Sequence, residues 1–492
     1  MILLRKLEKS LDFWFLLFSS FFFFLLRLPS LFEPYWYGDE GIYQTIGLAL
    51  SRGAVLYRDT WDNKPPAIYY LNSFFSSDQF TIRLISLIIG LIGVAFFFLL
   101  ARKILVRSIL ARGVTLLFII LFGLPLLEGN IANAENFMVP INIIAAYLIY
   151  TTVRSKKDQK KLLILPGLLL GISFLFKIVS IFDFGAFFVF LFIYDFSDRL
   201  TLQSIKNQIL RKIPHLLTFS VSFLIPFLLT AAYFASQHIF SLFLTSMFFS
   251  NIGYVGYGNK FIIPQGLLIF KVSLLGLSLL LIFLRRNYLK FTSSVFVLTW
   301  FSFSLFNAFF SQRPYPHYVL VIIPSLCLVL GLMFSYKRFS KLIGAVFLLS
   351  VFIILNYFSL YFKVFQYYTN FVKFTFDHTR VIPYQAFFDS VTPRDYEIAT
   401  LINMNIKQND NIFVWGNNVA IYKLTNRIPP GKYTALYHMT TYPDGISDTK
   451  RGLTKSNPRF IILTGNTPYP FSLYNYKVKI KIRDAIIYER NI

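Results

Sequence analysis

Long apolar runs separated by short polar segments dominate the chain up to about residue 363. A helix of roughly 20 apolar residues is long enough to cross a hydrocarbon core about 30 Å thick. The pattern therefore predicts an α-helical polytopic membrane protein with about eleven transmembrane helices. The predicted spans are 11–32, 80–100, 106–127, 136–153, 162–177, 178–194, 214–235, 262–284, 291–310, 317–335 and 341–362.

The pattern changes from about residue 364, where apolar runs shorten and Asp, Asn, Pro and Lys become common. The segments 411–416 and 459–465 are short apolar runs that end in turn residues, as buried strands do. The sequence Ile428-Pro429-Pro430-Gly431 between them indicates a loop. We therefore predict a membrane domain over 1–363 and a small α/β domain over 364–492.

Composition supports the membrane class. Hydrophobic residues make up 56% of the chain and charged residues only 14%, against about a quarter in a soluble globular protein. The mean hydropathy is +0.59. Cys327 is the only cysteine and lies inside an apolar run, so no intramolecular disulfide can form.

The formal net charge of +25 comes largely from basic residues in alternate loops. The positive-inside rule makes such loops cytoplasmic, which places the N-terminus inside and both the 33–79 loop and the C-terminal domain outside. Because membrane topology explains much of this charge, we expect no nucleic-acid partner. The basic residues are Arg5, Lys6, Lys9, Arg102, Lys103, Arg107, Arg112, Arg154, Lys156, Lys157, Lys160, Lys161, Arg199, Lys206, Arg211, Lys212, Arg285, Arg286, Lys290, Lys337, Arg338 and Lys341.

Ionisable residues concentrate in the first outer loop, 33–79. Gly38-Asp39-Glu40 is followed by Asp62-Asn63-Lys64-Pro65-Pro66, and Arg58 lies between these motifs. Carboxylates and a lysine presented together suit a site that handles both a proton and a phosphate. Asp39 could instead be a solvated surface residue. Glu40 could cap the following helix, where a carboxylate favours the positive end of the helix dipole.

Polar residues from other segments fall on the same predicted side of the membrane. Lys177 could instead extend to the lipid headgroups, and His317 could be a hydrogen-bonded interfacial residue. Six separate segments nevertheless bring polar groups to one side, which we interpret as a functional site. Those outside the first loop include Glu135, Lys177, Lys271, Arg313, His317 and Tyr318.

The sequence contains no HExxH motif, no clustered metal-ligand spacing, no P-loop and no GxGxxG motif. A structural metal site is therefore not predicted, although a divalent cation as cofactor is left open. Isolated cations at membrane boundaries are what an anionic lipid phosphate would require.

The order of four motifs resembles the membrane glycosyltransferases of the GT-C class. These motifs are Gly38-Asp39-Glu40, Asp62-Asn63-Lys64-Pro65-Pro66, Asn133-Ala134-Glu135 and Pro316-His317-Tyr318. Within that class the chain is similar to the bacterial protein O-mannosyltransferase and aminoarabinose-transferase superfamily. The resemblance implies transfer of a sugar from a polyprenyl-phosphate lipid to an acceptor on the outer side of the membrane. The absence of a DxD motif, the usual device for nucleotide sugars, agrees with such a donor.

The resemblance also implies roles for individual residues. Asp39 would be the general base, Lys64 would hold the donor phosphate, and Glu135 would match a second acidic position. The aminoarabinose-type motif has Glu immediately before Lys-Pro-Pro, whereas this chain has Asn63 there. This difference weakens any metal role and leaves the sugar and the acceptor open.

We therefore predict an extracytoplasmic, inverting glycosyltransferase, either a hexosyl- or a pentosyltransferase, in the cytoplasmic membrane. Asp39 and Glu40 are the candidate catalytic residues. The candidates for binding donor phosphate or substrate are Arg58, Asp62, Lys64 and the six residues named above. The expected partners are a polyprenyl-phosphate-linked sugar, a glycan, lipid or protein acceptor, and the bilayer. The alternatives are a flippase for a lipid-linked saccharide, and a polymerase or ligase for lipid-linked glycans.

Overall fold

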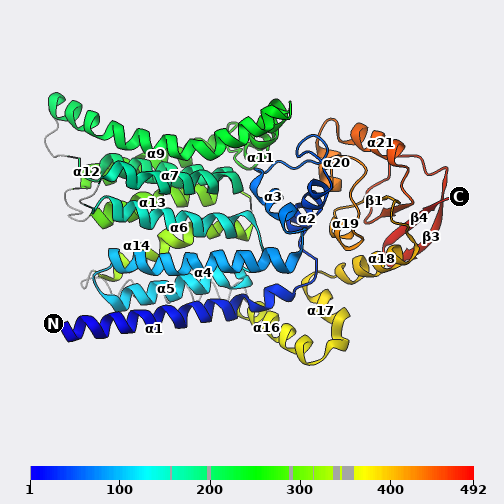
Figure 1. Cartoon of the computed structure of the whole chain (residues 1–492), viewed down its shortest axis with the longest axis horizontal. Helices are drawn as coiled ribbons and strands as arrows, with labels where there is room; N and C mark the ends of the chain where they lie inside the picture. Colours follow the sequence, from blue (N-terminus) through cyan, green and yellow to red (C-terminus); the bar gives the residue numbers. More distant parts are fainter. Residues whose placement is uncertain are drawn as a thin grey trace. The chain divides into compact units, whose positions relative to one another are not determined.

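The computed structural model describes residues 2–155, 158–196, 201–286, 292–313, 315–335, 344–345, 349 and 360–491 (Figure 1). The chain divides into two compact units. The first, here called the helical unit, consists of 1–28, 85–236 and 249–365. The second, here called the mixed unit, consists of 29–84, 237–248 and 366–492.

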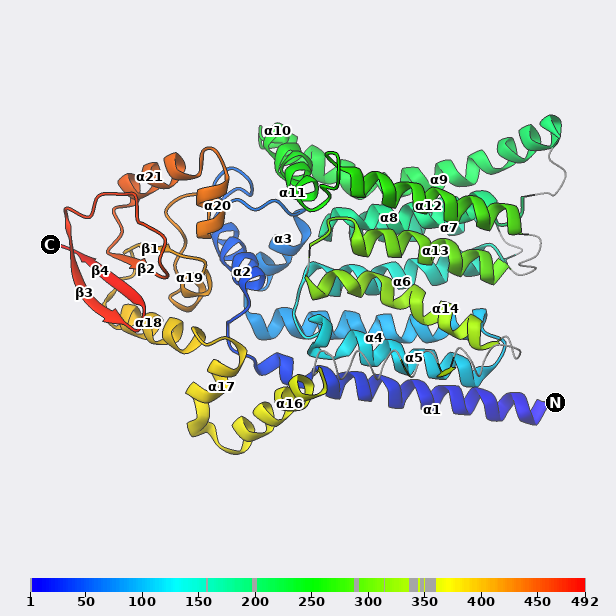
Figure 2. The same ribbon diagram turned by 180° about the vertical axis from the view of Figure 1, so that it is seen from behind.

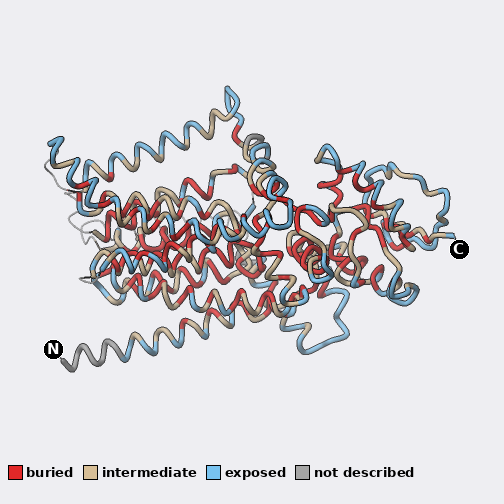
Figure 3. Tube along the Cα trace, turned by 45° about the horizontal axis from the view of Figure 1, so that its top comes forward, coloured by how far each residue is buried: buried red, intermediate tan, exposed pale blue. Residues whose placement is uncertain are grey.

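Long helices that run alongside one another build the helical unit (Figures 1 and 2). Several are exposed along much of their length, as the pale blue segments of Figure 3 show, and many of the exposed residues are large and apolar. Helix α12 is an example, because only Ile282 is buried while leucines such as Leu277 are half exposed. This surface suits contact with lipid. The helices are α1 (Ile2–Arg27), α4 (Gln79–Ile104), α5 (Ser108–Gly123), α6 (Ala134–Thr152), α7 (Gln159–Phe176), α8 (Ile181–Ile193), α9 (Leu202–Ser236), α11 (Ser250–Gly258), α12 (Gly266–Arg285), α13 (Thr292–Phe309) and α14 (Ile323–Ser335).

Seven described helical segments are long and apolar enough to cross a membrane, fewer than the eleven expected. The difference has local causes. The runs expected at 106–127 and 178–194 form shorter apolar helices, over Ser108–Gly123 and Ile178–Ile193. Helix α6 has 19 residues but includes Glu135, Asn136 and Asn142, which lower its hydropathy. The span expected at 341–362 lies mostly outside the described residues.

Two glycines let α7 and α9 pack closely. A Cβ atom added at Gly167 would lie 2.7 Å from the carbonyl oxygen of Phe219 and 2.7 Å from the Cβ of Ser222. One added at Gly171 would overlap the carbonyl oxygen of Phe223. Small residues spaced four apart are a common device for close helix contact in membranes. Here they fix the position of α7, which ends next to Lys177.

The C-terminal part of the mixed unit contains a four-stranded sheet in the order β1-β2-β4-β3. Strands β1 (Ile412–Trp415) and β2 (Phe460–Leu463) are parallel and lie within the two segments expected as strands. Strand β4 (Ala485–Arg490) pairs antiparallel with both β2 and β3 (Tyr476–Ile482). The helices of this part are α18 (Thr392–Asn405), α19 (Ala420–Leu424), α20 (Leu436–Thr441) and α21 (Gly445–Ser456); α16 (Leu360–Phe376) and α17 (Val381–Phe388) precede them.

The first loop is part of the mixed unit rather than an isolated excursion. It forms α2 (Gly38–Ser51) and α3 (Ala67–Phe74), and α10 (Phe240–Leu244) belongs to the same unit. The backbone N–H of Trp61 donates to the carbonyl of Lys432 at 2.9 Å, and the Trp61 ring packs edge-on against Tyr442. The segment that carries the Asp62–Pro66 motif is thereby anchored to the C-terminal part.

Candidate functional site

Helix starts position the charged residues of the first loop. Asp39 and Glu40 lie in the first turn of α2, where carboxylates favour the positive end of the helix dipole. Lys64 lies directly before Pro65 and Pro66, and Pro66 caps the N-terminus of α3. A proline restricts the residue before it to extended conformations, which limits the directions that Lys64 can take.

Asp39, Asp62 and Lys64 form one group, here called the Lys64 cluster. The Lys64 Nζ lies 3.4 Å from Asp39 Oδ2 and 3.6 Å from Asp62 Oδ2. The Asp62 side chain is 1% exposed, whereas those of Lys64 and Asp39 are 21% and 30% exposed. Asp62 is therefore the buried support, while Asp39 and Lys64 face accessible space.

Tyrosines and a histidine hold the buried side of the Lys64 cluster. Tyr69 donates its hydroxyl to Asp62 Oδ2 at 2.6 Å, and Tyr57 donates to the backbone carbonyl of Lys64 at 2.8 Å. Tyr43 donates to Asp39 Oδ2 at 3.3 Å. The His438 Nε2 lies 3.6 Å from Asp62 Oδ1. These contacts hold the backbone at Lys64 and the side chain of Asp39 in position.

The charge states within the cluster follow from burial and neighbouring charges. Burial opposes the charged form of Lys64, but the Asp39 and Asp62 carboxylates outweigh it and hold the pKa of Lys64 well above its ordinary value. Burial lowers the pKa of His438 to about 4, against the opposing effect of Asp62. At neutral pH the cluster therefore contains a cationic lysine and a neutral histidine.

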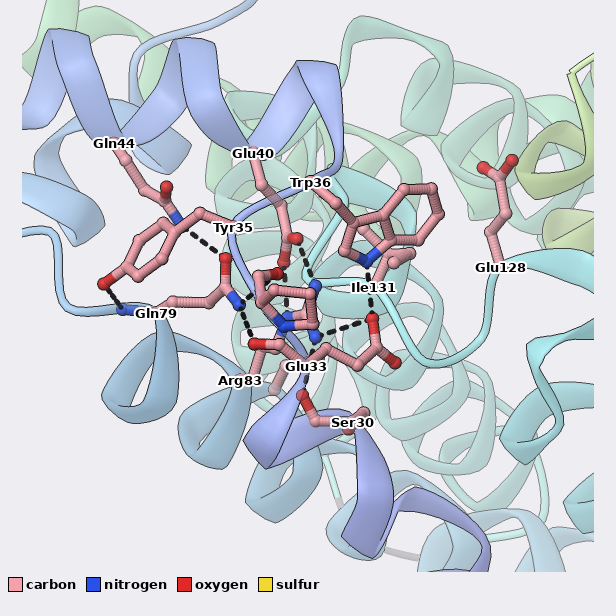
Figure 4. Close-up of polar contacts among 12 residues, drawn as sticks. Ser30, Glu33, Tyr35, Trp36, Glu40, Gln44, Gln79, Arg83, Glu128 and Ile131 are labelled. Carbon is pink, nitrogen blue, oxygen red and sulfur yellow. Dashed lines mark hydrogen bonds and ion pairs between the residues drawn. The ribbon is translucent and has the colours of Figure 1, made fainter. Parts of the chain in front are cut away.

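Glu40 belongs to a different arrangement from Asp39, and Figure 4 shows it beside Arg83 and Glu33. Its carboxylate accepts from Arg83 Nε at 3.0 Å and from Arg83 Nη2 at 2.5 Å. Arg83 Nη1 also pairs with Glu33 Oε2 at 2.9 Å and donates to the Ser30 carbonyl at 2.6 Å. All three charged side chains are buried. Glu40 thus ties the start of α2 to the start of α4.

The helical unit contains a second group, here called the Glu135 cluster. Glu135 lies in the first turn of α6 and forms an ion pair with Lys177, which occupies the break between α7 and α8. His317 Nδ1 lies 2.5 Å from Glu128 Oε2, and its Nε2 lies 3.8 Å from Glu135 Oε1. The Lys177 Nζ lies 4.1 Å from the centroid of the Tyr318 ring. Four residues singled out in the sequence therefore meet here.

A buried polar network supports the break that carries Lys177. Ser180 donates to Asn142 on α6 at 3.3 Å and to Ser173 on α7 at 3.0 Å. Asp183 accepts from the indole N–H of Trp300 at 2.7 Å. Because α6 carries both Glu135 and Asn142, one helix orients the break and supplies the partner of Lys177.

The remaining predicted residues have other surroundings. Arg58 forms an exposed ion pair with its neighbour Asp59 at 2.8 Å. Lys271 donates to Asn259 Oδ1 at 2.7 Å and to the carbonyl of Phe309 at 2.5 Å, so it links α12 to α13 and to the residue that follows α11. Arg313 is half-buried in the segment before Tyr318. Among the described residues, Arg58 makes no hydrogen bond or ion pair with the Lys64 cluster, and Lys271 makes none with the Glu135 cluster.

Sequence reasoning missed Tyr69, Arg83 and His438. Tyr69 lies seven residues after Asp62, in the first turn of the helix that follows the two prolines. This short separation is a signal from which the hydrogen bond between its phenol and the Asp62 carboxylate could have been predicted. Arg83 and His438 are separated from their partners by 43 and 376 residues along the chain, and no local pattern connects them. In the part of the chain that the structure describes, no group of three or more His, Cys, Asp or Glu side chains is arranged to hold a metal ion.

Known proteins resemble the chain in family pattern and in fold. Residues 63–233 match the family model of dolichyl-phosphate-mannose-protein mannosyltransferases. ArnT from Cupriavidus metallidurans in the apo state aligns with a TM-score of 0.59 and 12% identity, over 97% of this chain and 98% of ArnT. ArnT bound to undecaprenyl phosphate aligns with a TM-score of 0.51 and 13% identity, over 98% of this chain and 97% of ArnT.

The archaeal oligosaccharyltransferase AglB from Archaeoglobus fulgidus, in complex with an inhibitory peptide and a dolichol-phosphate, aligns with a TM-score of 0.49 and 11% identity, over 93% of this chain and 70% of AglB. No curated protein matches the chain in sequence.

These similarities agree with the class that the motifs indicate. The chain has a fold similar to that of ArnT, and its residues 63–233 fit the mannosyltransferase family model.

Proposed function

We propose that the protein is a glycosyltransferase that moves a sugar from a polyprenyl-phosphate donor to an acceptor hydroxyl. The observation that carries this proposal is the Lys64 cluster, in which an accessible carboxylate and an accessible ammonium lie 3.4 Å apart. The carboxylate can take a proton, and the ammonium can neutralise a phosphate. The family model matched by residues 63–233 and the ArnT fold support the same class of reaction.

In the proposed reaction Asp39 acts as general base. It takes the proton of the acceptor hydroxyl as the oxygen attacks the anomeric carbon of the sugar. A new C–O bond forms on one face while the bond from that carbon to the phosphate oxygen breaks on the other, which inverts the anomeric configuration. The electron pair of the broken bond leaves with the polyprenyl phosphate.

Lys64 stabilises the charge that develops on the departing phosphate. Preorganised charges aimed at developing charge are among the strongest contributions to catalysis. Asp62, buried and hydrogen-bonded to Tyr69, holds the lysine in place and keeps it protonated. Asp62 is therefore a positioning residue in this scheme. Glu40 is a second, because its pairing with Arg83 fixes the turn of α2 that presents Asp39.

We assign substrate binding to the Glu135 cluster. It presents a lysine, a histidine and the face of an aromatic ring, a combination that suits a sugar or a phosphate. Arg58, Lys271 and Arg313 are further candidates for contact with the donor phosphate, although Lys271 would have to exchange its present partners. The sugar is either a hexose or a pentose.

The proposed site lies on the extracytoplasmic face of the cytoplasmic membrane. Alternate loops of the chain are rich in Lys and Arg, and the positive-inside rule places these loops in the cytoplasm. The 33–79 segment lies on the other side by the same rule. A donor carried by a membrane lipid fits this face, because it needs no soluble nucleotide sugar.

The role of Asp39 is tested by substitution to asparagine, which keeps the shape of the side chain and removes the base. We expect transfer from a polyprenyl-phosphate sugar to fall at least 10²-fold, the usual contribution of general base catalysis. Asp59→Asn is the matched control, because Asp59 lies in the same loop but outside the Lys64 cluster, where it pairs with exposed Arg58 and accepts from the backbone N–H of Val55. An Asp39→Asn protein that folds and transfers sugar as fast as Asp59→Asn would disprove the assignment.

A further inference from the structure

A pocket of about 250 Å³ lies where the end of α6, the start of α7, the end of α8 and the first half of α9 meet. Its polar lining includes Gln159, Tyr194, Asp195, Arg211, Lys212 and His215. The volume equals that of roughly eight liquid waters at about 30 Å³ each, so it can hold a phosphate group. No step of the proposed reaction uses these residues.

The pocket is separate from the Glu135 cluster. Glu135 lies in the first turn of α6, whereas Thr152 and Val153 at the end of that helix line the pocket. At 1.5 Å per residue, the helix separates the two by about 25 Å. The pocket is therefore at the opposite end of the helical unit.

One of the residues that line the pocket is a buried lysine, Lys212. The Lys212 side chain is 6% exposed, forms an ion pair with Asp195 and donates to the carbonyl of Leu191 at 3.0 Å. Its Nζ also lies 4.6 Å from the centroid of the Tyr194 ring. These contacts fix the ammonium in place, so the positive charge is preorganised.

Two further donors lie one turn apart on α9. Arg211 and His215 are four residues apart and share a helix face. Among the described residues, the only hydrogen bond of Arg211 runs from Nη2 to Asp195 Oδ2 at 2.8 Å, and His215 makes none. The guanidinium and the imidazole can therefore still bind another group. Two permanent cations against one carboxylate leave the lining with an excess of positive charge.

Apolar residues of α9 flank the charged pocket. Leu210, Ile213 and Leu217 are 55%, 46% and 61% exposed. Acyl chains can cover such a surface while a headgroup occupies the pocket beside it. Basic pockets between membrane helices are a common place for anionic lipid headgroups.

We propose that this pocket binds a phosphate group, supplied by the headgroup of an anionic lipid. The phosphate oxygens accept hydrogen bonds from Arg211 and His215, and the ammonium of Lys212 adds a nearby positive charge. Asp195 pairs with both Lys212 and Arg211 and holds them in place when no phosphate is bound. The site is a lipid-anchoring site and has no part in sugar transfer.

The test measures the thermal unfolding midpoint of the delipidated full chain in neutral detergent. Phosphatidylglycerol, phosphatidylcholine and inorganic phosphate are titrated separately. We expect phosphatidylglycerol to raise the midpoint in a saturable way and phosphatidylcholine to leave it unchanged. An equal rise with inorganic phosphate would support the phosphate site but assign it to the free ion. No difference between phosphatidylglycerol and phosphatidylcholine, with no effect of inorganic phosphate, would overturn the proposal.

Variants link the effect to the pocket. Arg211→Gln and His215→Gln should each weaken the apparent affinity for phosphatidylglycerol at least 10-fold. Lys206→Gln is the matched control, because exposed Lys206 removes one positive charge from the same helix without lining the pocket. His215→Gln keeps the test valid if Arg211→Gln does not fold, since His215 has no hydrogen bond to lose among the described residues. Equal affinity in His215→Gln and Lys206→Gln would also overturn the proposal.

Discussion

Three carboxylates of one short segment have different surroundings, and these decide what each can do. Asp39 is partly exposed and touches Lys64, Asp62 is buried beneath the same lysine, and Glu40 is buried against Arg83. A base must reach the proton of its substrate, which only the exposed group can do. Of the pair Asp39-Glu40, Asp39 is therefore the candidate for the base, while Glu40 pairs with Arg83.

The burial of His438 predicts a dependence of stability on pH. Its pKa is about 4 in the folded protein because of burial, against an ordinary value of 6.5. Between these pH values the unfolded chain therefore carries a proton on His438 that the folded protein does not bind. The stability that the neutral, buried His438 contributes to the free energy of unfolding is complete above about pH 6.5 and is lost as the pH falls toward 4. The full loss is roughly 3 kcal/mol at 1.36 kcal/mol per pKa unit.

Thermal unfolding between pH 7 and pH 4.5 tests this expectation. His438→Gln should flatten the fall in the unfolding midpoint, because it removes the titrating group. His378→Gln, at an exposed position of the same unit, should leave the fall unchanged. Identical pH profiles for His438→Gln and the wild type would contradict the expectation.

The buried triad of Glu33, Glu40 and Arg83 predicts a large effect of substitution. Arg83→Gln leaves two buried carboxylates without their cation, and breaking a buried pair in this way costs about 3–5 kcal/mol. Arg102→Gln on the same helix removes a partly exposed partner of Asp12, which Arg112 also pairs with, and should cost less than about 1 kcal/mol. Denaturant titration of both variants measures the two values. Equal costs would show that the triad adds little.

At the scale of elements, close packing of α7 on α9 positions the break that carries Lys177. Gly167 and Gly171 allow the two backbones to approach, and Ser173 and Ser180 then meet Asn142 of α6. The position of Lys177 in the Glu135 cluster thus depends on the packing of α7 against α9 and on the contacts of Ser173 and Ser180 with each other and with Asn142. This dependence links helix packing to the placement of a charged side chain.

Gly171→Leu should therefore destabilise the helical unit. A side chain at this position overlaps the carbonyl of Phe223, and overpacking costs typically about 1–3 kcal/mol. Gly276→Leu is the matched control, because nothing lies within 4 Å of an added Cβ atom on α12. The unfolding midpoints of the two variants in detergent compare these cases directly. A Gly171→Leu midpoint at or above that of Gly276→Leu would refute this account of the packing.

The sequence could predict elements more readily than their partners. Apolar periodicity was sufficient for most long helices, and short apolar runs before turns were sufficient for β1 and β2. Fewer described helices than expected are long and apolar enough to cross a membrane, because polar side chains enter α6 and because α5 is short. Glu135 and Asn142 of α6 meet Lys177 and Ser180, which lie 42 and 38 residues away along the chain, so no local pattern predicts these pairs.

At the scale of the whole molecule, the order of the motifs along the sequence indicated the class of protein. Contacts between segments far apart in the sequence determined which residues lie together. The motifs named Asp39, Asp62 and Lys64 together, and the structure brings them within 3.6 Å of Lys64. They did not indicate that residues 29–84 and 237–248 pack into one unit with 366–492. Contacts such as Trp61 with Ser246 and Tyr442 are non-local and follow only from the complete fold.

The central claim is that this protein breaks the bond between a sugar and a polyprenyl phosphate. The most direct measurement reconstitutes the wild-type protein in liposomes with radiolabelled polyprenyl-phosphate sugars and a membrane extract as acceptor. We predict that label leaves the lipid and appears on an acceptor, with free polyprenyl phosphate released. Label that stays on the lipid while the intact molecule crosses the bilayer would contradict the claim and identify a flippase.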